Sequence, residues 1–125
     1  MNLSILLDEE YYAPGDMLSG TLAWFCDKVP DNLIVELHWR TSGRGTTDKG
    51  LVHKEKFPCS AKKGDQPFSF RIPPECPQTY RGRLVSITNF LKLRADIPWG
   101  RDPKTEVEVV ISRTGEPICP MAEVE

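Results

Sequence analysis

Two segments of this sequence concentrate side chains that could recognise a partner. The first, residues 40–49, carries Arg40, Arg44 and Asp48 among glycines and hydroxyl-bearing residues. Because the planar guanidinium group of arginine matches a carboxylate, this segment would suit an acidic peptide or a chain terminus. A solvated loop closed by an internal pair of arginine and aspartate is the alternative interpretation.

The second segment, residues 96–102, places Trp99 and Arg101 among turn-forming residues. Trp99 lies outside any alternating pattern of apolar residues, and an exposed loop tryptophan is a common anchor of protein interfaces. Packing of its indole over an open end of the fold is the alternative. The candidate partner-binding residues are therefore Arg40, Arg44, Asp48, Trp99 and Arg101.

A search for catalytic chemistry finds little. Catalysis needs a nucleophile beside a base, a pair of carboxylates, a metal cluster or a phosphate cradle. His38 falls on the polar face of a predicted strand, where a solvated side chain is the simplest interpretation. His53, Cys59 and Cys76 could meet as zinc ligands, but the chain has no Cys-x-x-Cys pair and reduced structural thiols are favoured. We therefore predict no enzyme, no catalytic residue, no metal and no cofactor.

Apolar residues alternate with polar ones through most of the chain, which predicts strands with one buried face. The strongest runs are those of Leu18, Leu22 and Trp24; Leu33, Val35, Leu37 and Trp39; Phe68, Phe70 and Ile72; Val85, Ile87, Leu91 and Leu93; and Val107, Val109 and Ile111. Weaker runs at residues 3–7 and 51–57 complete seven predicted strands.

Turns rich in glycine and proline separate these runs, and no helical periodicity is convincing. Short strands joined by such turns are typical of two facing sheets. We predict an all-β, seven-stranded antiparallel, immunoglobulin-like β-sandwich over residues 1–113, with closure into a barrel as the alternative. Residues 114–125 lose the alternation and are predicted to form a flexible tail.

Composition argues against several classes of partner. The 125 residues include 16 basic and 18 acidic side chains, a net charge of −2, without long runs of one sign. Nucleic acid and acidic lipid are therefore not expected partners. No segment approaches the roughly 18 consecutive apolar residues of a membrane span, and the short apolar run at the N-terminus lacks the basic start of a secretion signal. We expect a cytoplasmic domain that does not insert into membranes.

Two motifs follow one another in an order known from another family. The first, Tyr-x-x-Pro-Gly-Asp-x-x-Ser-Gly-x-Leu, is read in Tyr11, Pro14, Gly15, Asp16, Ser19, Gly20 and Leu22. The second joins a phenylalanine-rich strand, a proline-rich turn and a glycine-led strand, with Phe68, Phe70, Ile72, Pro73, Pro77, Tyr80, Gly82, Val85 and Ile87. Together they resemble the N-terminal domain of the arrestin family. The resemblance implies an arrestin-like sandwich in a single-domain form, whose partners are membrane-protein tails or regulatory assemblies.

One position departs from that pattern. Asn89 stands on the core-facing side of its predicted strand, where the resemblance would lead one to expect an aromatic residue. A buried amide must find hydrogen-bond partners or cost about 1–3 kcal/mol. Either the register shifts at this point or a buried polar network surrounds Asn89.

These inferences favour a non-catalytic intracellular protein-interaction domain, a scaffold or adaptor that binds through its loops or an exposed sheet edge. The alternative is a sandwich that binds a carbohydrate or small ligand by stacking it on Trp99, Tyr11 and Tyr12. A flat face of exposed aromatic rings would favour the alternative. The sequence leaves the oligomeric state open.

Overall fold

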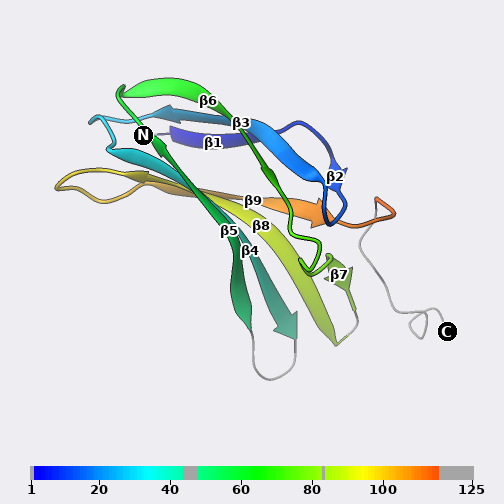
Figure 1. The fold of residues 1–125 in the computed structure, drawn as a ribbon. Coiled ribbons are helices and arrows are strands. Elements are labelled where there is room, and N and C mark those ends of the chain that lie inside the picture. Colours follow the sequence, from blue (N-terminus) through cyan, green and yellow to red (C-terminus); the bar gives the residue numbers. More distant parts are fainter. Residues whose placement is uncertain (1, 44–47, 83, 116–125) are drawn as a thin grey trace.

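The computed structural model describes residues 2–43, 48–82 and 84–115 of the chain. These residues form two curled layers of strands, which confirms the predicted all-β class (Figure 1). The strands are β1 (Asn2–Leu7), β2 (Tyr11–Tyr12), β3 (Met17–Phe25), β4 (Asn32–Gly43), β5 (Lys49–Pro58), β6 (Lys63–Arg71), β7 (Tyr80–Arg81), β8 (Val85–Asp96) and β9 (Lys104–Ile111). The described part of the chain contains no helix long and apolar enough to cross a membrane.

The seven longer strands correspond to the seven predicted ones, and the two-residue strands β2 and β7 are additions within the described residues. Most of the predicted tail, residues 114–125, lies outside the described residues. Among the described residues up to 113, the two sheets contain every strand.

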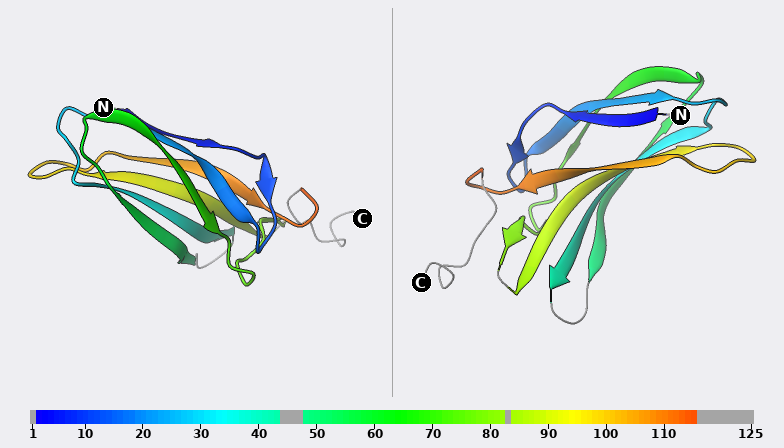
Figure 2. Two further views of the ribbon diagram at one scale, coloured as in Figure 1. Left: turned by 45° about the horizontal axis from the view of Figure 1, so that its top comes forward. Right: turned by 180° about the vertical axis from the view of Figure 1, so that it is seen from behind.

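The strands divide into a short sheet and a long sheet. The short sheet has the order β1-β3-β6, and the long sheet has the order β2-β9-β8-β4-β5 with β7 paired to β8. The two-residue strand β2 runs parallel to β9, which corrects the prediction of a purely antiparallel fold. The chain leaves the short sheet after β1, lies briefly beside β9, and returns to the short sheet as β3 (Figure 2).

The core lies between the two sheets and follows the predicted alternation. Val35, Phe70 and Val109, from three different strands, expose only 0%, 4% and 1% of their surface. Burying one apolar face of each strand against the opposite sheet supplies most of the driving force for this fold.

Trp39 is an exception to the predicted core. It continues the buried face of β4 but is only partly buried, and its indole lies over Gly50, where any side chain would collide with the ring. The reason is that the ends of β4 and β5 splay away from the short sheet (Figure 1). Trp39 lines a hollow beside Pro73 and Pro77 in place of a packed layer.

The Pro-Gly-Asp motif forms the tight turn that leads into β3. Gly15 adopts a φ of 91°, which favours glycine, and its N–H donates to the carbonyl of Ile72 at 2.9 Å. The Asp16 carboxylate accepts a hydrogen bond from the N–H of Ala13 at 2.9 Å. The turn therefore accounts for these residues.

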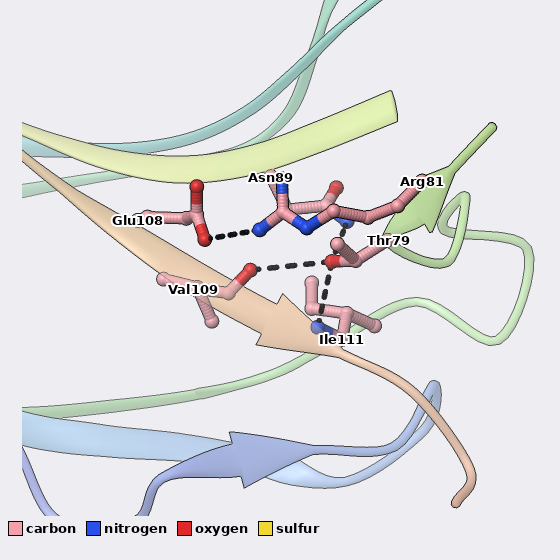
Figure 3. Close-up of polar contacts among 6 residues, drawn as sticks. All are labelled: Thr79, Arg81, Asn89, Glu108, Val109 and Ile111. Atoms are coloured by element: carbon pink, nitrogen blue, oxygen red, sulfur yellow. Dashed lines mark hydrogen bonds and ion pairs between the residues drawn. The ribbon is translucent and has the colours of Figure 1, made fainter. Parts of the chain in front are cut away.

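Asn89 lies in a buried polar network, and this outcome replaces the alternative of a shifted register. Its side chain is fully buried, and its amide nitrogen donates to the carbonyl of Pro77 at 3.1 Å and to the hydroxyl of Thr79 at 3.0 Å. The Thr79 hydroxyl also accepts from the N–H of Ile111 at 3.0 Å and donates to the carbonyl of Val109 at 3.4 Å (Figure 3). Every hydrogen-bonding position of that hydroxyl is thus used.

Candidate functional site

The five predicted partner-binding residues fall into two separate groups. Because β4 and β8 pair antiparallel along their whole length, the C-terminal end of β4 and the β8–β9 loop lie at opposite ends of the long sheet (Figure 1). Trp99 and Arg101 lie at one end, and Arg40 and Asp48 lie toward the other. Arg44 lies outside the described residues. The candidates therefore do not form one site.

Trp99 is the most exposed large apolar side chain among the described residues, with 99% of its surface accessible. Its φ of 58° lies in the left-handed region, which is uncommon for a bulky residue and is maintained only when the surroundings enforce it. The prediction that Trp99 lies in a loop away from the core is confirmed. The indole does not cover an open end of the sandwich.

Asp102 holds the loop that carries Trp99, residues 97–103. One oxygen of its carboxylate accepts the N–H of Ile97 at 3.0 Å, and the other accepts the guanidinium of Arg94 at 2.8 Å. These two bonds, the backbone N–H first, lower the pKa of Asp102 below its ordinary value. Because Ile97 is 7% exposed and packs in the core, the loop is fixed at both of its ends.

A small cleft lies at the same end of the molecule, between this loop and the β3–β4 loop. Its volume is about 140 Å³, and it is lined by Asp27, Lys28, Ile97, Gly100 and Arg101. Most of the surface that these residues present to the cleft is apolar. We call the cleft together with the loop 97–103 the Trp99 end. It combines an exposed aromatic anchor, a small apolar recess and charged groups of both signs, as protein interfaces do.

Arg40, from the second group, lies on the outer face of the long sheet. A wider cleft of about 410 Å³ is lined there by His38, Arg40, Lys49, Leu51, Phe90 and Glu106, and we call it the Phe90 cleft. The Phe90 ring is only 8% exposed. The guanidinium carbon of Arg40 lies 4.6 Å from the centre of that ring, and the imidazole of His38 stacks on it at 5.3 Å.

Arg40 and Asp48 do not pair with each other. Arg40 instead approaches the carboxylate of Glu106 at 3.9 Å, while Asp48 bonds through its backbone: its carbonyl accepts the N–H of Thr41 at 2.7 Å, and its N–H donates to the Thr41 hydroxyl at 2.9 Å. Asp48 therefore closes the β4–β5 hairpin. Arg40, a candidate named from the sequence, thus lines the Phe90 cleft. Phe90 was not among the candidates, because an isolated aromatic residue on the polar face of β8 gives no repeating pattern.

The three aromatic residues considered for ligand stacking share no face. Tyr12 is only 3% exposed, and its hydroxyl donates to the carbonyl of Ser19 at 2.9 Å. Tyr11 is 48% exposed, but it lies beside Val110 at the end of the long sheet opposite Trp99. The expected stacking surface of Trp99, Tyr11 and Tyr12 is therefore wrong.

The thiols and the imidazole considered for catalysis or metal binding are held by contacts within the fold. Burial raises the pKa of the Cys76 thiol to about 11, and burial followed by the neighbouring Cys59 raises that of Cys26. The imidazole of His53 stacks on Phe70 at 4.2 Å and lies 2.9 Å from the carboxylate of Glu55. Among the described residues, no three His, Cys, Asp or Glu side chains are grouped so that they could hold a metal ion.

Comparison with known proteins yields a likeness of fold. No family model matches the chain, and no curated protein matches it. Among solved structures, the chain is similar to Spo0M, a sporulation control protein from Bacillus subtilis, with a TM-score of 0.72 and 17% sequence identity. The match covers 88% of this chain and 48% of the Spo0M chain, so the chain spans about half the length of that protein. This likeness supports the predicted β-sandwich.

Proposed function

We propose that this chain is a non-catalytic, intracellular protein-interaction domain that binds its partner through the Trp99 end. The observation that carries the proposal is the full exposure of Trp99 on a loop that Asp102 fixes in place. Tryptophan is among the residues that contribute most when buried at an interface. A loop that is already ordered loses little further entropy on binding, so more of the contact energy appears as affinity.

The neighbouring cleft completes the proposed interface. A partner that covers Trp99 would also reach the apolar recess beside Ile97 and Gly100, while Lys28 and Arg101 provide polar contacts at the rim. The resemblance to the arrestin family suggests an arrestin-like topology and a membrane-protein tail or a regulatory assembly as the class of partner. A scaffold or adaptor role fits both suggestions.

The state of the thiols supports a role without catalysis. A raised pKa keeps the Cys76 and Cys26 thiols protonated at neutral pH, and the thiolate rather than the thiol is the nucleophile. Asp102, whose pKa is lowered, uses both carboxylate oxygens to hold its loop. These groups serve the fold.

The proposal is tested by replacing Trp99 with alanine in the full chain. Immobilised wild-type protein should retain a partner from native lysate, identified by mass spectrometry, and the Trp99→Ala variant should lose it. Leu6→Ala is the matched control, since Leu6 is 72% exposed on the short sheet and its truncation removes apolar surface elsewhere. Full retention of the same partner by Trp99→Ala would contradict the proposal.

The same variant separates the protein partner from a carbohydrate. An exposed tryptophan beside a recess can also stack on a sugar ring. The carbohydrate-binding alternative therefore rests on Trp99 alone, without Tyr11 and Tyr12. A glycan array that reports binding by wild type and none by Trp99→Ala would favour the carbohydrate-binding function. Absence of glycan binding on the array, together with Trp99-dependent retention of a protein, would support the interaction domain.

A further inference from the structure

A β-bulge determines which side chains β5 presents on the outer face of the long sheet. The pairing of β4 with β5 slips by one residue after Leu37, and Val52 is left without a partner. Because side chains alternate along a strand, such a slip exchanges the inward and outward positions beyond it. Lys49 and Leu51 face outward as a result, opposite Arg40 and His38. Without the bulge, both would point toward the sandwich interior.

The bulge thus creates an unfavourable charge pair. Arg40 and Lys49 are direct cross-strand partners, and like charges in this position destabilise a sheet. The carboxylate of Glu106 is 3.9 Å from the Arg40 guanidinium, and both side chains are about half exposed, so that contact is weak. Lys49 forms no ion pair with any described residue.

A second pair on the same face shows that the fold can neutralise such charges. Arg94 lies directly opposite Lys104 on β9, but the Asp102 carboxylate bonds the Arg94 guanidinium at 2.8 Å. An anion is therefore supplied by the chain itself at the Trp99 end. At Arg40 and Lys49 no comparable carboxylate is in place.

Apolar groups adjoin the cation pair. The Phe90 ring forms the floor of the cleft, with the Arg40 guanidinium above it. Leu51, which the bulge turns outward, is 53% exposed at the side of the cleft. An occupant should accordingly carry an anionic group next to an apolar one.

We propose that the Phe90 cleft is a second binding site, which takes an acidic peptide. A glutamate or aspartate carboxylate of the peptide binds between Arg40 and Lys49, and an adjacent apolar side chain packs on Leu51, beside Phe90. The carboxylate supplies at this pair the negative charge that Asp102 supplies at the other. Its planar shape also suits the guanidinium group of Arg40.

The charges around the cleft favour a peptide over a broad polyanion. Glu36 and Glu106 both lie directly opposite Lys92, on either side of it, and Glu108 pairs with Arg81 at 2.8 Å. A membrane surface or a nucleic acid strand would meet these carboxylates as well as the cations. A single carboxylate between two cations avoids that repulsion.

The test uses the full ¹⁵N-labelled chain and a capped ten-residue peptide that alternates glutamate and leucine, followed by NMR titration. Shifts should concentrate at residues 38–40, 49–51 and 90–92. Lys49→Glu should weaken binding at least tenfold. Lys56→Glu is the matched control, because it makes the same charge change on the same strand, opposite Ile34 and away from the cleft, and it should weaken binding less than twofold.

Further variants separate this proposal from others. Leu51→Ser should weaken binding severalfold while preserving the spectrum of the folded protein, and Trp99→Ala should leave peptide binding unchanged, so this site and the proposed interaction at the Trp99 end fail independently. Equal weakening by Lys49→Glu and Lys56→Glu would overturn the proposal, since net charge alone would then explain binding. Tighter, Lys49-dependent binding to phosphatidylserine vesicles or to a DNA oligonucleotide than to the peptide would also overturn it.

Discussion

Polar groups hold the two ends of the long sheet in different ways. Toward the end opposite Trp99, Thr79 and Asn89 form a network with no accessible surface. At the Trp99 end, the Asp102 carboxylate accepts the hydrogen bonds that hold the loop, and a quarter of its side chain is exposed. Water can replace the partners of Asp102 but cannot reach Thr79. The buried network should therefore matter more for global stability, and the exposed contacts more for the local conformation of a loop.

The difference fits the binding role proposed for the Trp99 end. A loop that meets a partner benefits from contacts that set its local shape and contribute little to global stability. The Trp99 loop, with a positive φ at its tip, is fixed by two hydrogen bonds that one carboxylate accepts. Segments that bind partners are commonly drawn from the less stable parts of a fold.

Thr79→Val should give the largest loss of stability among the changes considered. The substitution preserves shape but removes the hydroxyl that accepts from Asn89 and Ile111, leaving buried N–H groups without an acceptor. We expect a loss of about 2–6 kcal/mol in the free energy of unfolding, at about 1–3 kcal/mol for each of the two unsatisfied groups. Urea denaturation followed by circular dichroism measures it.

Thr105→Val provides the matched control for this change. Thr105 lies on the inward side of β9, opposite Leu93, and is only partly buried. The same substitution there should change the free energy of unfolding by less than about 0.5 kcal/mol. Equal losses at both positions would mean that the network around Asn89 contributes nothing specific.

Asp102→Asn should have a smaller effect on stability and a larger one on the loop. The amide can still accept from the N–H of Ile97, but it loses the charge that binds Arg94. We expect a loss of about 1–2 kcal/mol, together with faster amide hydrogen exchange confined to residues 97–103. Exchange that accelerates throughout β8 and β9 would contradict a local role.

The pH dependence of stability should differ between the wild-type protein and the Asp102→Asn variant. Because the pKa of Asp102 is lower in the folded state than its ordinary value near 3.8, its stabilising contribution is complete above that value. The contribution is lost as the pH falls below 3.8 and through the folded pKa. The wild-type protein should therefore approach the stability of Asp102→Asn in acid, and an unchanged difference down to pH 2 would show that the charge of Asp102 is irrelevant.

The architecture followed from the sequence because alternation is a direct record of burial. Val35 and Val109 lie on runs with a strict period of two, and both are buried as predicted. Trp39 belongs to the same run as Val35, yet it is partly exposed. Periodicity reports which side of a strand a residue occupies, and it cannot report that the opposite sheet has curved away at that point.

The candidate surfaces were predictable only in part. Turn chemistry around Trp99 indicated an exposed loop, and the structure agrees. The slip at Val52 is not predictable from the sequence, because a bulge depends on how two distant segments pair, which no local pattern contains. Lys49 and Leu51 are consequently absent from the candidates named from the sequence. The ion pair considered between an arginine and the aspartate of the same loop is not formed by Arg40, which approaches Glu106.

Lys49→Glu should give a smaller change in stability than Asp102→Asn, and one of opposite sign. Replacing the lysine opposite Arg40 converts a repulsive cross-strand pair into an attractive one, which should stabilise the fold by about 0.2–1 kcal/mol at low salt. The gain should shrink in 1 M sodium chloride, where charges are screened within about 3 Å. Thermal unfolding at two salt concentrations measures both effects.

Lys104→Glu sharpens the same comparison at the other end of the sheet. Its partner Arg94 already binds the Asp102 carboxylate at 2.8 Å, so a second carboxylate there meets a neutralised arginine and a neighbouring negative charge. The expected change is within about 0.3 kcal/mol. If Lys104→Glu stabilises the protein as much as Lys49→Glu, the two cation pairs are electrostatically equivalent, and the Arg40–Lys49 pair loses its distinction as a place where an external carboxylate is needed.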